Sequence, residues 1–204
     1  MVAYRQDNAA KQPDWFNAPA PSFGDADARL LVVGLAPGVS GANRTGRPFT
    51  GDYAGDLLYG ALAKFGFSEG TFDARPDDGL RLRRAMITNA VRCAPPENKP
   101  TGAEIATCRS FLSARLAALP ELSAILCLGR IAHDSTVRAL GLKLKDAPFA
   151  HGARHAAPPA TPDGGPLTLF DSYHCSRYNT NTGRLTEAMF FAVFADIRAH
   201  LDAD

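Results

Sequence analysis

The chain alternates short, wholly apolar runs with longer stretches in which apolar side chains recur every three or four residues. An apolar run of four to eight residues bounded by turn-forming residues is typical of a buried strand. Four such runs predict strands at residues 29–34, 85–91, 124–128 and 167–173. The stretches with helical spacing predict helices at about residues 54–66, 101–119, 130–140 and 185–201. Thr101 and Glu104 form a capping-box pattern at the start of the second of these helices.

Strands that alternate with helices indicate a parallel sheet that is covered by helices on both faces. We therefore expect an α/β protein, built as a three-layer α/β/α sandwich with a central four-stranded parallel sheet. The length of 204 residues fits one domain over residues 1–204. Residues 1–28 are polar and contain three prolines, which predicts an irregular lead-in. Residues 151–166 are rich in Pro, Gly and Ala and predict a surface loop.

The most unusual segments of the chain lie at or just after the predicted strands, at residues 34–38 (GLAPG), 88–93 (TNAVRC) and 174–179 (HCSRYN). Ligands of open parallel sheets bind beyond the carboxyl ends of the strands, so these segments should meet at one edge. The first segment opens a loop over residues 34–56 that holds six glycines. Loops of this length are usually functional, although a flexible surface loop is the alternative. A phosphate-binding P-loop does not fit, because its Gly-Lys-Ser/Thr ending is absent.

Composition excludes a strongly basic nucleic-acid binder, because the net charge is only +1 and 21% of residues are charged. Any contact with DNA would need a local basic patch. The chain has no apolar run of membrane-spanning length and no leader-like start, so we expect a cytoplasmic, nucleoid-associated monomer without membrane contact. Its four cysteines include no Cys-x-x-Cys pair, which leaves a zinc finger without support.

Three motifs carry a resemblance to a known family. Residues 34–38 together with residues 45–52 (TGRPFTGD), residues 87–93 (ITNAVRC) and residues 174–180 (HCSRYNT) resemble the motifs of family 5 uracil-DNA glycosylases. These enzymes are close to the family 4 iron–sulfur enzymes, which have Glu where this chain has Leu35. The resemblance runs in order from about residue 22 to residue 200. It implies the three-layer fold expected above.

The resemblance also implies a DNA base-excision repair glycosylase. Such an enzyme flips out a deaminated base, here uracil and also hypoxanthine or other deaminated purines, and hydrolyses its N-glycosidic bond to leave an abasic site. The expected partner is double- or single-stranded DNA that contains such a base. A non-catalytic DNA-binding module on the same fold is the main alternative, and a small-molecule nucleotide hydrolase is another.

Chemistry and resemblance together assign roles to three candidate catalytic residues. His174 would donate a hydrogen bond to the oxygen of the departing base, because fixed donors stabilise the charge that develops there. Asn89 would read the base edge, since an amide offers both a donor and an acceptor. Asp52 would position the attacking water, although it could instead cap the helix that begins near Ala54. The candidate substrate-binding residues are Gly34, Leu35, Ala36, Gly38, Phe49 and Asn89.

Phe49 would stack on the extruded base, although a core position is its alternative role. Candidate DNA contacts come from the motif loops, where arginines could neutralise phosphates or remain merely solvated. These candidates are Arg47, Ser176, Arg177 and Asn179, and Arg44 and Arg184 in or beside the same loops could also neutralise phosphates. Tyr178 adds an aromatic side chain to the same loop, whose composition suits a wedge. His133 is expected to be structural, and metal binding by His151 and His155 has no nearby carboxylate pair to support it.

The resemblance implies a 4Fe-4S cluster held by four cysteines, of which Cys93 and Cys108 correspond to the later pair. The earlier pair, a Cys-x-x-Cys, has no counterpart in this sequence. A cluster needs four protein ligands as a rule, and Cys127 and Cys175 do not replace the missing ones. Two explanations stay open: the sequence begins after the first pair, or this variant lacks the cluster. No catalytic metal is expected.

Overall fold

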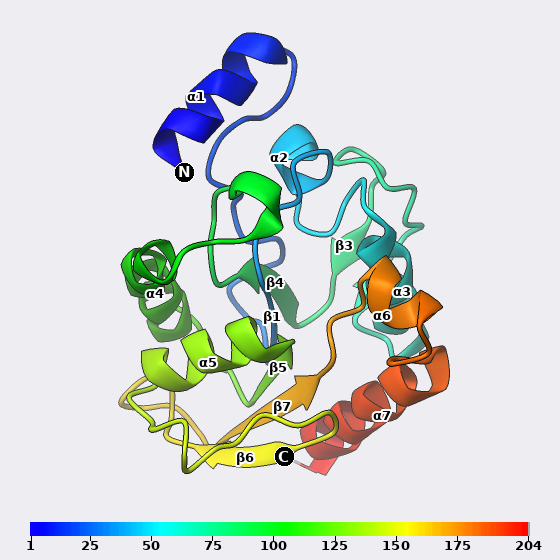
Figure 1. Cartoon of the computed structure of the whole chain (residues 1–204). Coiled ribbons are helices and arrows are strands. Elements are labelled where there is room, and N and C mark those ends of the chain that lie inside the picture. Colours follow the sequence, from blue (N-terminus) through cyan, green and yellow to red (C-terminus); the bar gives the residue numbers. More distant parts are fainter. Residues whose placement is uncertain (204) are drawn as a thin grey trace.

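A five-stranded sheet forms the centre of the protein, whose computed structural model describes residues 1–203 (Figure 1). The strand order is β4-β1-β5-β7-β6. Four strands are parallel, as predicted: β1 (Leu30–Gly34), β4 (Ala85–Asn89), β5 (Ala124–Leu128) and β7 (Leu167–Ser172). The fifth strand, β6 (Arg154–Ala157), adds an antiparallel edge that the sequence did not predict.

Seven α-helices and three short elements complete the described chain. The helices are α1 (Val2–Lys11), α2 (Ala42–Thr45), α3 (Tyr53–Lys64), α4 (Gly102–Ala117), α5 (Arg130–Ala139), α6 (Arg177–Asn181) and α7 (Glu187–Ala203). A 3-10 turn, η1, covers Pro96–Asn98, and β2 (Ser68–Glu69) pairs with β3 (Arg81–Leu82). The four long helices agree with the prediction to within one or two residues at most ends. The capping box of Thr101 and Glu104 is confirmed, with both of its hydrogen bonds present.

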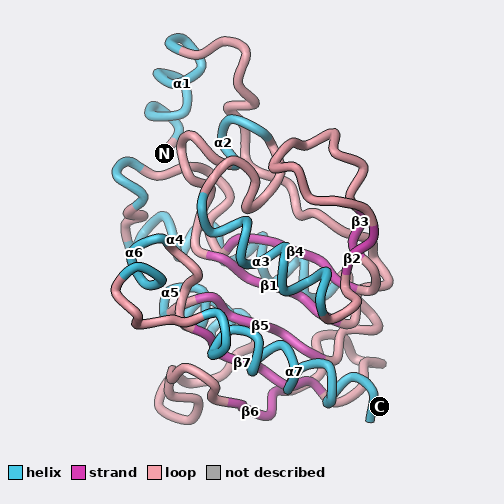
Figure 2. Tube along the Cα trace, turned by 90° about the vertical axis from the view of Figure 1, so that its right-hand side faces the viewer, coloured by secondary structure: helices cyan, strands magenta, loops and turns pink. Residues whose placement is uncertain are grey.

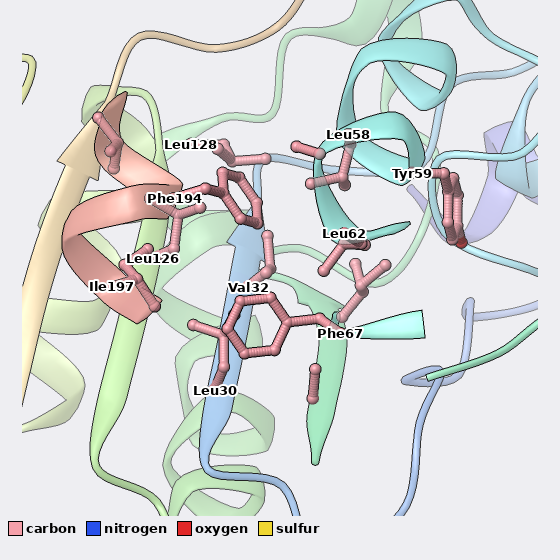
Figure 3. Packing of buried hydrophobic residues seen from close by; sticks show 14 of the residues in the cluster. Leu30, Val32, Leu58, Tyr59, Leu62, Phe67, Leu126, Leu128, Phe194 and Ile197 are labelled. Carbon is pink, nitrogen blue, oxygen red and sulfur yellow. The ribbon is translucent and has the colours of Figure 1, made fainter. Parts of the chain in front are cut away.

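Alternate side chains of each strand point to opposite faces of the sheet, and this produces two separate cores. On one face, strand residues pack against α3 and α7, as Figure 3 shows for Val32, Leu62 and Phe194. On the other face, residues such as Val33 and Ile125 pack against α4 and α5. Figure 2 shows α3 and α7 in front of the strands. The expected α/β/α sandwich is therefore confirmed, with five strands instead of four.

Three segments differ from the sequence prediction. The expected irregular lead-in contains α1, which projects from the top of the molecule in Figure 1 and buries no residue. Such a helix lacks the apolar stripe by which an amphipathic helix is recognised. Helix α2 forms inside the glycine-rich loop, and β6 lies within residues 151–166 because the outer edge of β7 offers it unpaired backbone groups. Within residues 1–203, no helix is both long and apolar enough to cross a bilayer.

Candidate functional site

The three motif segments meet at the carboxyl edge of the sheet, where they enclose a cavity of about 440 Å³. This volume lies within the roughly 300–1,000 Å³ typical of small-molecule sites. The predicted residues that line it are Leu35, Ala36, Gly38, Phe49, Asp52, Asn89, His174, Ser176 and Arg177. The structure therefore brings together all three candidate catalytic residues, from segments more than 30 residues apart along the chain.

Gly34 lies beside the cavity residues and not in the cavity wall. It ends β1 opposite Asn89 of β4, because the two strands pair in parallel register. A Cβ atom at Gly34 would come within 2.4 Å of Asn89 Oδ1 and 2.7 Å of the Phe49 ring. Contacts this short do not occur in folded proteins, so glycine is required for both side chains to occupy their observed positions.

Phe49 combines burial with an uncommon backbone conformation. Its φ angle is +57°, a left-handed value that side chains other than glycine rarely adopt and that costs on the order of 1–3 kcal/mol. Its ring stacks on the imidazole of His174, with centroids 6.0 Å apart and an interplanar angle of 26°. Gly55 packs tightly against the Phe49 backbone, since a Cβ there would collide with the Phe49 carbonyl oxygen. The surrounding fold therefore holds the strained residue at the cavity.

Asn89 is buried at the end of β4, where it is only 7% exposed. Its neighbour Thr88 accepts a hydrogen bond from Ser22, whereas within residues 1–203 no protein group hydrogen-bonds the Asn89 carboxamide. The carboxamide borders the cavity, and its polar atoms are not among the fully enclosed side-chain atoms that lack a partner. Its donor and acceptor are therefore available to a ligand in the cavity.

His174 follows β7 and contributes its imidazole to the same wall. Burial lowers the pKa of His174 to about 4, so the ring is neutral at pH 7. The carboxamide of Asn179 donates a hydrogen bond of 2.8 Å to the His174 carbonyl oxygen. Ser176 caps α6 by accepting from the Asn179 backbone N–H. These contacts hold the loop that carries His174.

Asp52 occupies the N-cap position of α3, but its side chain makes no capping hydrogen bond. Its Oδ1 is buried and has no hydrogen-bond partner in the described part of the chain. Gly41 leaves room for the carboxylate, because a Cβ there would lie 2.8 Å from Asp52 Oδ2. Burial raises the pKa of Asp52, and the nearby Asp56 carboxylate acts in the same direction. The backbone N–H groups of Gly55 and Ala54 at the start of α3 act against this shift, so a role at the helix start remains the alternative to positioning water.

Arg47 lies in the interior and not on the surface where a contact with DNA was expected. It is buried and forms a bidentate ion pair with Asp78, with N–O distances of 2.8 and 2.7 Å. Its guanidinium also lies 5.0–5.6 Å from the ring centroids of Phe23, Tyr59 and Phe72. The ion pair holds the pKa of the Asp78 carboxyl well below its usual range. Arg47 therefore anchors the motif loop inside the protein.

The other candidate DNA contacts divide between surface and interior. Arg177 is exposed and lies 5.1 Å above the Tyr53 ring, and Tyr178 next to it is 72% exposed. The side chain of Asn179 instead turns inward to the His174 carbonyl, as described above. Tyr53 and Asn98 also line the cavity, although the sequence analysis did not select them. Asn98 lies in the proline-rich segment after the second motif. This composition was the only feature of the sequence that could have pointed to Asn98 as a cavity residue.

The cysteines do not assemble a metal site. Cys93 is partly buried and accepts a hydrogen bond of 3.6 Å from Arg5, while Cys108 is buried on α4. Within residues 1–203, no three His, Cys, Asp or Glu side chains form a group that could hold a metal ion. Two thiols do not provide the four thiolates that a 4Fe-4S cluster requires. The residues present therefore do not fit the cluster, and no chemical step is assigned to it.

His133 is confirmed as a structural residue. Its ring nitrogens contact the Asp171 carboxylate at 2.7 Å and the Ala147 carbonyl oxygen at 2.8 Å in the interior. His151 Nδ1 accepts a hydrogen bond from the Tyr173 backbone N–H. Both histidines therefore contribute to the packing beneath the carboxyl edge of the sheet.

The fold and the cavity define a class of α/β proteins with a ligand-sized cavity beyond the carboxyl ends of parallel strands. The chain belongs to the uracil DNA glycosylase superfamily, whose family model matches residues 21–198. It is 43% identical to a Type-5 uracil-DNA glycosylase of Thermus thermophilus, over 97% of this chain and 90% of that protein. It is 40% identical to the Type-5 enzyme of Mycobacterium tuberculosis, over 97% and 75% of the two chains.

A Type-4 uracil-DNA glycosylase of Archaeoglobus fulgidus is 36% identical, over 55% of this chain and 49% of that protein. The likeness to the Type-5 enzymes therefore extends over much more of the chain. These findings confirm the family that the three motifs indicated.

Proposed function

We propose that this chain hydrolyses the N-glycosidic bond of uracil in DNA and leaves an abasic site. The observation that carries the proposal is that Asp52, Asn89 and His174 line one cavity of nucleobase scale, together with Phe49. The relatives named uracil-DNA glycosylases support the same activity. Such a base must leave the helix to enter the cavity, which costs a few kcal/mol.

The departing base takes the electron pair of the broken C1′–N bond, so negative charge develops on its ring and oxygens. A neutral His174 can stabilise this charge by donating its N–H, because its low pKa keeps the ring from acting as a proton source at pH 7. The sugar becomes cationic, and water then attacks C1′. Asp52, which lines the cavity, orients this water and accepts its proton.

Two finer features of the substrate belong to the proposal. Leu35 gives the cavity an apolar wall in place of a polar group, so a base is held by shape and stacking as well as by Asn89. Together with the volume of the cavity, this favours acceptance of hypoxanthine and other deaminated purines in addition to uracil. Both double- and single-stranded DNA are proposed substrates.

The test is the formation of alkali-labile abasic sites in labelled oligonucleotides that carry one uracil, hypoxanthine or normal base. Asp52→Asn should slow uracil release by at least about 100-fold, on the scale of losing one charge-stabilising group, while binding is retained. Asp163→Asn, exposed in the loop before β7 and away from the cavity, is the matched control and should cleave like the wild type. Wild-type turnover by Asp52→Asn would remove Asp52 from the mechanism. Binding without any cleavage by the wild type would favour the non-catalytic module.

A further inference from the structure

A second cavity of about 470 Å³ lies directly beside the first one. Leu35 and His174 line both cavities, so the two share a wall. The rest of the second cavity is formed by the start of α5, by residues 149–150 and by the segment from Tyr173 to Arg184. Four of its lining residues, Arg130, Phe149, Tyr173 and Arg184, have no role in the chemistry proposed above.

Two arginines at this cavity are stacked on aromatic rings. The guanidinium of Arg130 lies 5.3 Å from the Phe149 ring centroid, and that of Arg184 lies 4.7 Å from the Tyr173 centroid. The two rings are themselves neighbours, with centroids 6.2 Å apart. Stacking holds a guanidinium by its face and leaves the N–H groups at its edge free to bind an anion.

The charge of these two arginines is not compensated by the protein. Of the described residues that line the cavity, none carries a carboxylate. Within residues 1–203 neither arginine forms an ion pair, whereas Arg154 and Arg198 are paired with Asp196 and Asp202. Two unpaired cations on an aromatic floor match a ligand that has both phosphate charge and a flat ring. Nucleotides of a single strand have this chemistry.

We propose that the second cavity binds the nucleotide adjacent to the extruded base on the same strand. Its phosphate contacts Arg130 and Arg184, and its base lies against the stacked pairs that these arginines form with Phe149 and Tyr173. This occupant is inferred from the shared wall. A strand with one base in the first cavity must place the adjacent nucleotide within one nucleotide of Leu35 and His174, which line both cavities. The inference rests on the proposed function, since that function fills the first cavity.

The first experiment measures binding by fluorescence anisotropy across a range of salt concentrations. The ligand is a labelled single-stranded oligonucleotide that carries a non-cleavable abasic analogue, so that catalysis is not required. Arg130→Gln combined with Arg184→Gln should weaken binding at least about tenfold at 0.1 M salt. It should also reduce the slope of log K against log salt by about 0.7, since the single phosphate held by the two arginines contributes about 0.7 on a single strand. Arg138→Gln, exposed in the last turn of α5, is the control and should bind with the wild-type slope.

The second experiment distinguishes binding of a nucleotide in this cavity from non-specific electrostatic attraction of the DNA to the protein. Uracil oligonucleotides are shortened one nucleotide at a time from each end, and KM and kcat are measured for each. Wild-type KM should rise sharply when the nucleotide that occupies the cavity is removed from one side. The double variant should have a raised KM throughout and show no further rise at that step.

The outcomes distinguish the two proposals. A slope and a length dependence equal to those of Arg138→Gln would overturn the second subsite while leaving the glycosylase proposal intact. Absence of cleavage by the wild type, with binding still dependent on Arg130 and Arg184, would overturn the glycosylase proposal alone. A thermal melt verifies that the double variant is folded, which is expected because Arg130 and Arg184 are exposed.

Discussion

Protonation of His174 should destabilise the protein in acid, because the fold holds the half-buried imidazole in its neutral form. The pKa of a histidine free in the unfolded chain is about 6.5, and burial lowers that of His174 to about 4. For a group whose pKa falls on folding, the full stability is present above the unfolded value. It is lost progressively as the pH falls towards the folded value.

The magnitude follows from these two pKa values. At pH 7.5 the imidazole is neutral in both states and contributes almost no difference. At pH 5 the unfolded state is almost fully protonated and the folded state is not, which lowers the free energy of unfolding by up to about 2 kcal/mol. The pKa of Asp52 shifts in the opposite direction, because burial raises it. Asp52 contributes equally to the pH dependence of the wild type and of a His174 variant, so it cancels when the two are compared.

The comparison is between the wild type and His174→Gln, which cannot titrate in this range. Urea unfolding is followed by far-UV circular dichroism at pH 7.5 and pH 5, because the single tryptophan, Trp15, lies in the N-terminal segment and would report local change. Between these two pH values, the free energy of unfolding of the wild type should fall by about 2 kcal/mol more than that of the variant. Equal losses, or an NMR titration of His174 near pH 6.5, would refute the idea that the ring is buried in its neutral form.

Two further predictions concern stability alone. Asp78→Asn leaves the buried Arg47 guanidinium without its counter-charge and should lower the free energy of unfolding by about 3–5 kcal/mol in a urea melt. Asp73→Asn, which disrupts an exposed ion pair, should change it by less than about 1 kcal/mol, and a similar effect of both variants would contradict the anchoring role of Arg47. Thr101→Ala removes the capping box of α4 and should cost about 1 kcal/mol in the same assay. An unchanged midpoint would mean that the cap contributes nothing.

Features with a local cause could be predicted from the sequence. The parallel strands are apolar runs buried on both faces, so their composition alone marks them, as it does for β1 and β5. The capping box of α4 depends on Thr101 and Glu104, which are three positions apart in the sequence. The convergence of the motif loops followed from the rule that parallel strands present their carboxyl ends at one edge. These parts of the fold and of the site require no knowledge of distant contacts.

Features with a distant cause could not be predicted in this way. Arg47 stands in a polar motif loop and resembles a DNA contact, but its partner Asp78 lies 31 residues away, in a segment that carries no motif. Strand β6 forms because β7 offers it an open edge, and its own residues show no strand-like alternation of apolar and polar side chains. The second cavity likewise depends on an arginine of α5 meeting an aromatic ring of a later loop.

The chain has a net charge of +1, and its arginines differ in whether a carboxylate compensates them. Some arginines outside the cavities form ion pairs, as in Arg84–Glu121 and Arg154–Asp196, whereas Arg138 forms none within residues 1–203. Around the two cavities, and within residues 1–203, Arg130, Arg177 and Arg184 have no such partner. These three charges act locally, since exposed charges beyond about 10 Å are screened at 0.1 M salt, and the first cavity also contains the carboxylate of Asp52. Under the proposed function, so few phosphate contacts would give a shallow salt dependence, and the discrimination between bases would depend on the cavity itself.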